Sequence, residues 1–346
     1  MNEVLKNRAL EKVEKFFADQ SDVHGYDVSG TIPGEKFSIS EESEHVWLSE
    51  IAGDDAFLNE VDIDTVSAQV FNVIDNEFTD LVASRTDTDK NDRQTTAIDG
   101  ITGVKYTCEE TNHDTHVRFS TLNKWALAPN HKGFQLKVES RRANAQREDF
   151  LKIGWNGEKV AVETNKEENP LGQDVNIGWI KNIETHAPTR IIDCEAEGIF
   201  IGEGGLSSVD AAALYMKDLL DEKYHVNLRL YGKSNFFTDR NIRLSEKSHA
   251  SDIVSGAVAE TMTVVGGDII ARSPRYMPAD MLVLTPVKNL AIRVQEGSQR
   301  KGFYVNHKRS RFENYSTQNE AFPVSRYDAI IVLKNLKFKK SDTEGA

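Results

Sequence analysis

The sequence predicts an α+β fold built from a reaching arm, a long helix and an inserted α/β unit. A polar stretch at residues 79–114, flanked by strand-like segments, indicates the arm. A proline-free stretch rich in helix-forming side chains, at 130–155, indicates the long helix. A strand–helix–strand pattern within 191–285 indicates the α/β unit. The 346 residues suffice for two domains or one elaborated domain.

Composition and charge narrow the class of protein. Apolar residues make up 39% and charged residues 28%, as in ordinary soluble proteins. The net charge of −13 favours solubility and argues against a nucleic-acid-binding protein. Cys108 and Cys194 lie outside any CxxC pattern, which predicts a reducing compartment. Because no secretory signal is visible and the apolar runs are too short to span a bilayer, we expect a soluble cytoplasmic protein without a membrane segment.

The first segment, residues 1–20, has the apolar periodicity of an amphipathic helix, with Leu5, Ala9, Val13 and Phe16 on one face. A turn-rich stretch follows it. Two interpretations remain open: an arm that docks on a neighbouring subunit, or a helix packed on its own domain.

The arm is predicted from the segments around it. Val66–Ile74 and Thr115–Thr121 have strand character, and the polar sequence between them lacks a helical period. A loop of this length is uncommon inside a compact domain. We therefore favour an extended two-stranded arm that reaches over a neighbour, with disorder as the alternative.

The long helix is bounded at both ends by its sequence. Pro129 stands just before it, where a helix start tolerates proline, and Asn156 with Gly157 provides a stop. In the α/β unit, we expect a strand at 198–202, a helix at 207–224 capped by Ser207 or Ser208, and a strand at 226–232. Strand-like segments at 290–295 and 327–338 then lie on either side of the polar stretch 300–316.

The strongest enzyme-like signal is the glycine-rich turn GEGGLS, which begins at Gly202 between a predicted strand and a predicted helix. Ser207 occupies the place of the third glycine of a dinucleotide fingerprint, and no P-loop motif is present. Asp221 and Glu222 are spaced suitably for a ribose contact, but their helix is rich in acidic residues throughout. A tight turn before a capped helix is therefore the favoured interpretation.

Neither a metal site nor a nucleophile is predicted. His113 and His116 lie among three carboxylates, but on a strand they would point to opposite faces, so a solvated arm strand is favoured. The basic run 307–312 could contact phosphate, although a charged loop paired with acidic neighbours such as Glu313 is the more common outcome. No GxSxG motif occurs, and neither cysteine has a nucleophile's context.

One block of residues, 153–191, resembles the major capsid proteins of P2-like tailed phages. There a Gly-aromatic-Asn-Gly turn ends the long helix, and an Asn-Pro-Leu-x-Gln-Asp-Val-x-x-Gly-Trp motif follows. The matching residues are Gly154, Trp155, Asn156, Gly157, Asn169, Pro170, Leu171, Gln173, Asp174, Val175, Gly178 and Trp179.

Further blocks are similar to the same family in the same order. The segment 275–292 contains the Tyr-x-Pro-Ala-Asp pattern with Pro278, and 311–329 begins with Arg311, Glu313, Asn314 and Tyr315. The glycine-rich turn and the segment 105–126 also resemble the family. Together the blocks cover roughly residues 100–335, whereas the first 60 residues and the arm tip match poorly.

The resemblance implies the HK97-like capsid fold. The implied parts are an N-terminal arm at 1–60, an extended E-loop hairpin at 61–118, a peripheral domain with the spine helix at 119–190, an axial α/β domain at 191–285 and a return to the peripheral sheet at 286–346.

The implied function is that of a major head protein. Copies of the chain would form pentamers and hexamers that tile an icosahedral shell around double-stranded phage DNA. No catalytic, cofactor-binding or metal-binding residue is implied, so we do not expect an enzyme. Two alternatives stay open: a nucleotide-binding enzyme that uses Gly202–Gly205, and a non-viral shell of the same fold that encloses other cargo.

The resemblance also implies partners and a location. The partners are other copies of the chain, a scaffolding protein or maturation protease, the portal and decoration proteins. Packaged DNA would be contacted only weakly because the chain is acidic. The protein would reside in the virion after assembly in the bacterial cytoplasm, and the segment before about Ser40 would be removed or would face the scaffold.

The motif at 169–179 is expected to form a structural turn after the long helix. Gln173 and Asp174 would hydrogen-bond backbone groups in the turn. Trp179 would bury a large apolar area beside Gly178. We expect this burial to lie within one subunit rather than across a contact between subunits.

Overall fold

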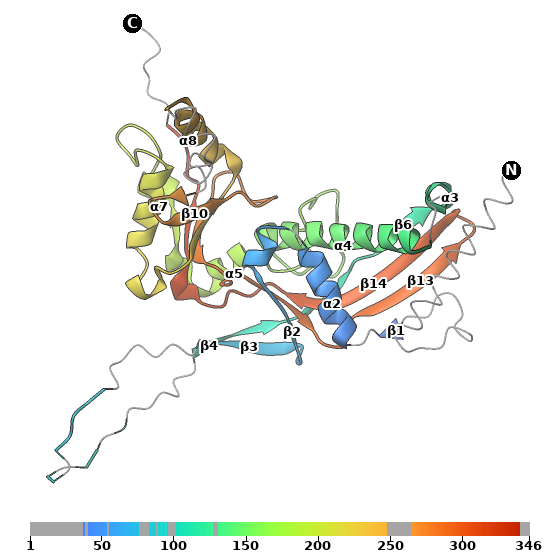
Figure 1. Cartoon of the computed structure of the whole chain (residues 1–346), viewed down its shortest axis with the longest axis horizontal. Coiled ribbons are helices and arrows are strands. Elements are labelled where there is room, and N and C mark those ends of the chain that lie inside the picture. Colours follow the sequence, from blue (N-terminus) through green and yellow to red (C-terminus); the bar gives the residue numbers. More distant parts are fainter. Residues whose placement is uncertain are drawn as a thin grey trace, which may run out of the picture.

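The computed structural model describes residues 37–38, 41–53, 55–75, 102–126, 131–247 and 264–339, with short stretches between 83 and 95. Two bodies, each built on one large sheet, lie side by side, and a thin hairpin projects away from them (Figure 1). The helix expected at 1–20 lies outside the described residues. None of the helices in the described ranges is long and apolar enough to cross a membrane.

The larger sheet has seven strands in the order β1-β13-β14-β12-β2, with β5 and β6 paired along the other edge of β14. All its pairings are antiparallel except that of β12 with β2. Its strands are β1 (Phe37–Ser38), β2 (Asp62–Val66), β5 (Glu109–Asn112), β6 (Thr115–Arg118), β12 (Ala291–Gln295), β13 (Arg300–Asn306) and β14 (Arg311–Ala321).

The polar stretch 300–316, expected to separate two strands, is itself strand: it forms β13 and most of β14. The 11-residue β14 is the central strand of the sheet and is buried along most of its length. Its buried side chains include Glu313, Gln318 and Glu320. These polar side chains hydrogen-bond to one another and to residues of other segments. Because polar residues occupy buried positions in this way, β14 lacks the apolar alternation that marks a strand in sequence.

The predicted long helix is confirmed as α4 (His131–Asn156), which runs alongside the seven-stranded sheet (Figure 1). It ends where Gly157 N–H donates to Ile153 O at 2.7 Å. Shorter elements surround it: α2 (Glu41–Ala52), η1 (Leu58–Glu60), α3 (Phe119–Ala126), α5 (Trp179–His186) and η2 (Pro188–Arg190).

The second body is built on a six-stranded sheet in the order β7-β15-β11-β8-β10-β9. The expected strand at 226–232 is confirmed as β8. The elements of this body are β7 (Ile191–Asp193), α6 (Cys194–Glu197), α7 (Val209–Asp218), η3 (Glu222–Tyr224), β8 (Leu228–Gly232), α8 (Ser234–Lys247), β9 (Val264–Val265), β10 (Ile269–Arg272), β11 (Leu282–Pro286), η4 (Tyr327–Ala329) and β15 (Ile331–Lys334).

Two expectations for this body need correction. The segment 198–202 is not a strand: Ile201 makes only isolated bridges to Leu206 and Phe338, because the chain turns at Gly202, where φ is +147°. The helix expected at 207–224 is shorter, since α7 ends at Asp218 and a separate 3-10 turn follows.

The projecting hairpin consists of β3 (Val70–Asp75) and β4 (Thr102–Thr107), paired antiparallel from Val70 with Thr107 to Asp75 with Thr102. It forms a sheet of its own, joined to the bodies at one end (Figure 1). The two-stranded arm is therefore confirmed at its base. The strand expected at 115–121 belongs instead to the seven-stranded sheet, as β6. Much of the outer part of the arm lies outside the described residues.

The six-stranded sheet is buried on both faces and so joins two apolar cores. In β11, Val283 faces the core shared with α2, α4 and α5, whereas Leu282 and Leu284 face the core under α7 and α8. In β15, Val332 and Leu333 divide in the same way. Because a fully buried side chain of this kind contributes about 1.5–3 kcal/mol, this double-sided burial fixes the two bodies to each other.

Candidate functional site

The motif at residues 153–179 folds into a junction between the end of α4 and the start of α5. Gly157 and Gly178 meet there, and Gly178 N–H donates to Gly157 O at 3.0 Å. A Cβ added at Gly157 would lie 2.3 Å from Asn176 O, and one at Gly178 would lie 2.4 Å from Ile153 O. Two backbone segments therefore cross here at a distance that only glycine permits.

A buried carboxylate organises the loop between these glycines. Asp174 Oδ2 accepts from Asn165 N–H at 2.7 Å and from Asn169 Nδ2 at 3.1 Å. Gln173 Oε1 accepts from Leu171 N–H at 3.0 Å. Pro170 lies exposed in the same turn. These side-chain hydrogen bonds add to the backbone hydrogen bonds of the loop, such as those from Asn169 N–H to Asn165 O at 2.8 Å and from Ala161 N–H to Asp174 O at 2.9 Å.

The side chain of Trp179 fills the interior of the junction. Its side chain is fully buried, and its Nε1–H donates to Ala291 O in β12 at 2.8 Å. The ring centroid lies 5.3 Å from that of Trp155, 5.8 Å from Phe57 and 5.9 Å from Phe322. All of these partners belong to its own chain, so Trp179 ties α5 to α4 and to the seven-stranded sheet.

The loop before β11 is attached to the same place. Asn156 Nδ2 donates to Tyr276 O at 2.9 Å and to Lys152 O at 3.0 Å. Met277 is buried in the shared core, and Pro278 next to it is partly covered. The structure therefore brings Pro278 to the junction, although 121 positions separate it from Gly157 in the sequence.

The remaining motif residues lie elsewhere, at the start of β14. Glu313 is their common partner: it accepts from Arg311 Nε at 2.5 Å, from Tyr315 OH at 2.8 Å and from Asn306 Nδ2 at 3.2 Å. The Tyr315 hydrogen bond and the Arg311 charge lower the pKa of Glu313. Asn314 is buried beside Thr115, to whose Oγ1 its Nδ2 donates at 3.4 Å. The motif residues thus form two clusters rather than one site.

A second group of residues, not anticipated from the sequence, is centred on Glu60. This buried carboxylate accepts from Arg229 Nε at 2.8 Å, from Arg272 Nε at 3.3 Å and from Tyr231 OH at 3.1 Å. Burial, followed by the charge of Glu60, raises the pKa of Tyr231. Because η1 precedes β2 and its partners lie in β8 and β10, Glu60 links the two bodies.

His113 corrects another expectation. It was expected in a solvated strand, but β5 and β6 pair with β14, and the turn between them places His113 in the interior. Its Nε2 lies 3.1 Å from Glu320 Oε2, and its Nδ1 lies 3.6 Å from Asp149 Oδ2. Burial alone would lower the pKa of His113, but the charge of Glu320 and the contacts of Asp149 outweigh it and raise the pKa to about 9.

Comparison with known proteins identifies the architecture that these contacts maintain. Residues 12–336 match the family model of the phage major capsid protein, P2 family. The chain belongs to this family. It is 26% identical over 340 residues to the capsid proteins of Escherichia phage P2, covering 94% of each chain. It is also 26% identical over 254 residues to the major capsid protein of Serratia phage KSP20, covering 69% of this chain and 72% of that one.

A solved structure supports the fold of the capsid protein. The chain matches a chain of the satellite phage P4 procapsid that includes the size determination (Sid) protein, with a TM-score of 0.69 and 26% identity. The match covers 86% of this chain and 99% of the other. The capsid protein therefore has the HK97-like fold, and α4 is its long spine helix.

The enzyme-like features of the capsid protein have structural explanations. In the glycine-rich turn, Gly202 N–H donates to Leu206 O at 2.8 Å, and a Cβ on Gly205 would lie 2.4 Å from Phe200 O. Ser208 caps α7 by accepting from Ala211 N–H at 3.2 Å. The expected helix cap is thus Ser208, and the glycines serve a close turn packed on Phe200.

The two cysteines are also internal. Burial raises the pKa of the Cys108 thiol to about 12 and that of the Cys194 thiol to about 11, so both remain protonated near neutral pH. No group of three or more potential metal ligands occurs among the described residues. The family and its named relatives are structural proteins, and every cluster described above links elements of the fold.

Proposed function

We propose that this capsid protein assembles into pentamers and hexamers that close an icosahedral shell around double-stranded phage DNA. The observation that carries the proposal is the match to the P4 procapsid chain, which extends over 99% of that chain. The family match over residues 12–336 supports it independently. Rings of five or six copies require heterologous contacts, in which different faces of neighbouring copies meet.

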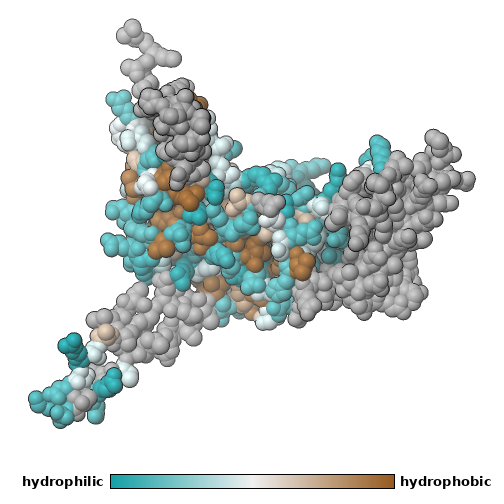
Figure 2. Space-filling model, in the orientation of Figure 1, coloured by the Kyte–Doolittle hydropathy of each residue, from teal (hydrophilic) through white to brown (hydrophobic). Residues whose placement is uncertain are grey.

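Two features of the capsid protein would supply such contacts. The β3–β4 hairpin lies outside both bodies and pairs with neither of their sheets (Figure 1). Apolar side chains are also exposed on the six-stranded body, including Leu214, Val226 and Ile242, and Figure 2 shows apolar surface over this body. Modest contacts of this kind, repeated around every copy, would give a stable shell through avidity, while misplaced copies could still dissociate.

We propose that the chain is divided into the following parts of the capsid fold. Residues 1–60 act as an N-terminal arm and 61–118 as the E-loop. Residues 119–190 form the peripheral domain, 191–285 the axial domain, and 286–346 return to the peripheral sheet. The return includes β12, β13 and β14, whereas β15 pairs with β11 and β7 in the axial sheet.

The motif residues would stabilise this fold rather than take part in a chemical reaction. The junction around Trp179 and Asp174 sets how the axial sheet sits on the spine helix, and the cluster around Glu313 sets the start of β14. A fixed angle between the two bodies would make each copy present its contact faces in the same geometry. The protein would therefore act without catalysis.

The proposed partners and location follow from the same role. Besides other copies, a scaffolding protein or maturation protease, the portal and decoration proteins would bind the capsid protein. DNA would be held weakly because the chain carries a net charge of −13. The mature protein would reside in the virion after assembly in the bacterial cytoplasm. Intact mass from mature particles tests removal of the segment before about Ser40: a full-length mass would exclude it.

Electron microscopy of the chain expressed with and without its scaffold partner tests the proposal. Closed shells, or rings with five- and six-fold symmetry, are expected in at least one condition. Monomers in both conditions, together with a nucleotide-dependent rise in the unfolding temperature, would contradict it and favour a nucleotide-binding protein. Cargo protein instead of DNA in particles from the native host would favour a non-viral shell.

A further inference from the structure

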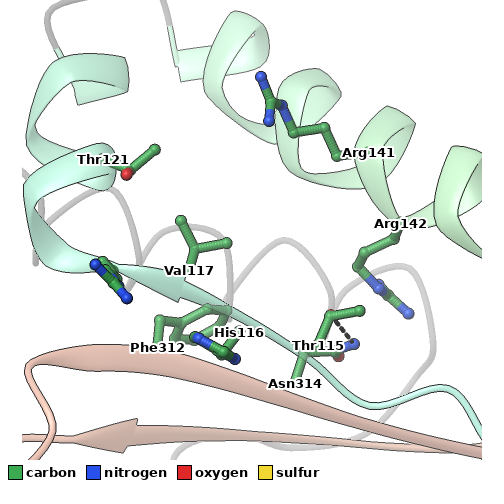
Figure 3. A pocket seen from close by; sticks show the side chains of 9 residues that line it. Thr115, His116, Val117, Thr121, Arg141, Arg142, Phe312 and Asn314 are labelled. Atoms are coloured by element: carbon green, nitrogen blue, oxygen red, sulfur yellow. Dashed lines mark hydrogen bonds between the residues drawn. The ribbon is translucent and has the colours of Figure 1, made fainter. Parts of the chain in front are cut away.

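The face of the seven-stranded sheet that points away from α4 is basic at one end. On β6, Val117 points into the cavity between this strand and α4 (Figure 3). Its neighbours His116 and Arg118 therefore lie on the opposite face, because successive side chains of a strand alternate between the two faces. Both of these side chains are exposed.

The strand register places two arginines directly opposite each other on this face. Arg118 of β6 is paired with Arg311 of β14, and like charges in such positions destabilise a sheet. Glu313 offsets only the second arginine: its carboxylate accepts from Arg311 and is shared with Tyr315 OH and Asn306 Nδ2. Arg118 forms no ion pair within the part of the chain that the structure describes. The fold alone therefore does not explain why an arginine stands here.

The turn between β13 and β14 adds positive charge beside this pair. Lys308 and Arg309 are exposed in the turn, and neither forms an ion pair with any residue that the structure describes. The turn is fixed in shape, since Asn306 Oδ1 accepts from Arg309 N–H at 3.0 Å and Ser310 O accepts from Phe119 N–H of α3 at 3.0 Å. Both cations are thus presented from an anchored turn.

Two tyrosines lie on the same face between these cations and Arg300. Tyr304 of β13 is paired with Glu313 and is 41% exposed, and Tyr315 of β14 is 39% exposed. Tyrosine combines an apolar ring with a hydroxyl group and is enriched in protein interfaces. We call the surface formed by Arg118, Arg300, Tyr304, Lys308, Arg309 and Tyr315 the basic face.

The size of the basic face decides which kind of anion fits it. The three strands are about 10 Å across, and the run from Arg311 to Thr317 along β14 extends about 20 Å. Farther along the same face lies Glu110, paired with Asn319 and next to Glu296. One turn of duplex DNA is about 34 Å long, so it would overrun the cations and meet these carboxylates. A short peptide segment fits within the face.

We propose that the basic face is a docking site for a short acidic segment of a partner protein. Carboxylates of the segment meet Arg118, Lys308 and Arg309, and its apolar side chains pack on Tyr304 and Tyr315. The chain as a whole carries a net charge of −13, which repels long polyanions and leaves this local group of cations to short acidic segments. The proposal does not rest on shell assembly.

Binding of a labelled peptide tests the proposal. The probe is a short, fluorescently labelled peptide of glutamate and leucine, titrated with the full-length chain and followed by fluorescence anisotropy. Arg118→Glu and Lys308→Glu should each weaken binding about fivefold, because each replaces an attraction by a repulsion. Lys159→Glu is the matched control: it makes the same charge change at an exposed position in the loop after α4 and should change binding less than about twofold.

Thermal unfolding of the same variants separates docking from folding. Arg118→Glu should keep or raise the unfolding temperature while it weakens binding, because the new carboxylate stands opposite Arg311. A falling unfolding temperature would overturn the argument from the arginine pair, and Lys308→Glu, in the turn, would then decide whether the face binds the peptide. Unchanged binding in both folded variants would overturn the proposal.

Further arms exclude other occupants. A peptide with glutamine in place of glutamate should bind about tenfold more weakly. Equal losses in Lys308→Glu and Lys159→Glu would overturn the proposal, since the effect would then come from the overall charge. Tighter binding of a DNA duplex, lost in Arg118→Glu, would overturn it in favour of nucleic acid. Tighter binding of a peptide with the acidic residues 193–203 of the chain would overturn it in favour of a second copy.

Discussion

The junction behind α4 and the β3–β4 hairpin are two regions of the same chain built in opposite ways. At the junction, Trp155 and Trp179 are almost completely buried and stack on further aromatic rings of the shared core. In the hairpin, two strands pair only with each other, and Val70 at its base is 44% exposed. An isolated two-stranded hairpin is marginally stable at best.

The hairpin is attached to the bodies mainly at its base. Tyr106 is buried there, and its hydroxyl accepts from Val324 N–H at 3.2 Å and is hydrogen-bonded to Tyr327 OH. Beyond this anchor, no ring contact joins the described part of the hairpin to either body. Apolar burial is therefore concentrated at the junction, whereas most of the described hairpin residues are exposed or half-exposed.

The largest expected effect on folding is at the centre of the junction. Trp179→Ala should lower the free energy of unfolding by about 3–5 kcal/mol, because it leaves a cavity beside three aromatic rings and removes the hydrogen bond to Ala291. Chemical denaturation measures the change. Val162→Ala is the control, because Val162 is fully exposed and should change stability by less than about 0.5 kcal/mol. Similar losses in both variants would contradict the special role of the junction.

Glu60→Ala should have the next largest effect. It should lower the free energy of unfolding, measured by chemical denaturation, by about 3 kcal/mol, because it leaves the partly buried Arg229 without its carboxylate partner. The partly exposed Arg272 should contribute less. Glu195→Ala is the matched control: its ion pair with Lys337 is exposed on both sides and should contribute less than about 1 kcal/mol. Equal losses would mean that Glu60 does not link the two bodies.

His113 makes part of the stability depend on pH. Its pKa is raised from 6.5 to about 9 by Glu320 and Asp149, so the protonated ring stabilises the fold fully below pH 6.5, and this contribution is lost as pH rises through about 9. We expect the free energy of unfolding to fall by on the order of 2 kcal/mol between pH 6 and pH 9.5. Denaturant titrations at both pH values measure it.

Two variants isolate the histidine in that experiment. His113→Gln should remove most of the pH dependence, whereas His116→Gln should leave it unchanged because His116 is exposed on β6. Asp149 and Glu320 both face His113, so Asp149→Asn should lower the pH at which stability is lost. A wild-type pH dependence that survives in His113→Gln would assign the titration to another group.

The two regions also differ in how far their sequences predict them. A proline-free, helix-forming composition was enough for α4, and strand propensity was enough for β8 and the existence of the arm. The motif of the junction was found through its resemblance to a capsid family, not through residue chemistry. Neither route finds Glu60 or Glu320, because Glu60 meets Arg229 across 169 positions and Glu320 meets His113 across 207. Such pairs are neighbours only in the folded sheets, so no local pattern in the sequence marks them.

The mispredicted strands have a related cause. β14 is buried but polar. Its side chains hydrogen-bond to one another, as Gln318 does to Glu320, and to residues of other segments, as Glu320 does with His113, so its local pattern resembles a loop. The opposite error occurred at 198–202, where apolar residues suggest a strand but Gly202 turns the chain. Local patterns therefore predict elements whose burial follows the helix or strand period, and they fail where burial depends on long-range polar pairing.

The smallest effect on the free energy of unfolding is expected at the hairpin tip, around residues 84–90. Variants there test most directly how the hairpin differs from the junction. Asp87→Lys combined with Asp89→Lys removes the exposed ion pair of Asp87 with Lys90 and should change the free energy of unfolding by less than about 0.5 kcal/mol. Shell formation, measured by sedimentation and electron microscopy, should nevertheless fall sharply, because the reversed charges would meet neighbouring copies. Ser84→Ala, at the same tip without a charge change, should leave both measurements unchanged. A large fall in the free energy of unfolding of the double variant would show that the tip stabilises the fold of its own chain. Normal shell formation would show that other parts of the chain contact the neighbouring copies.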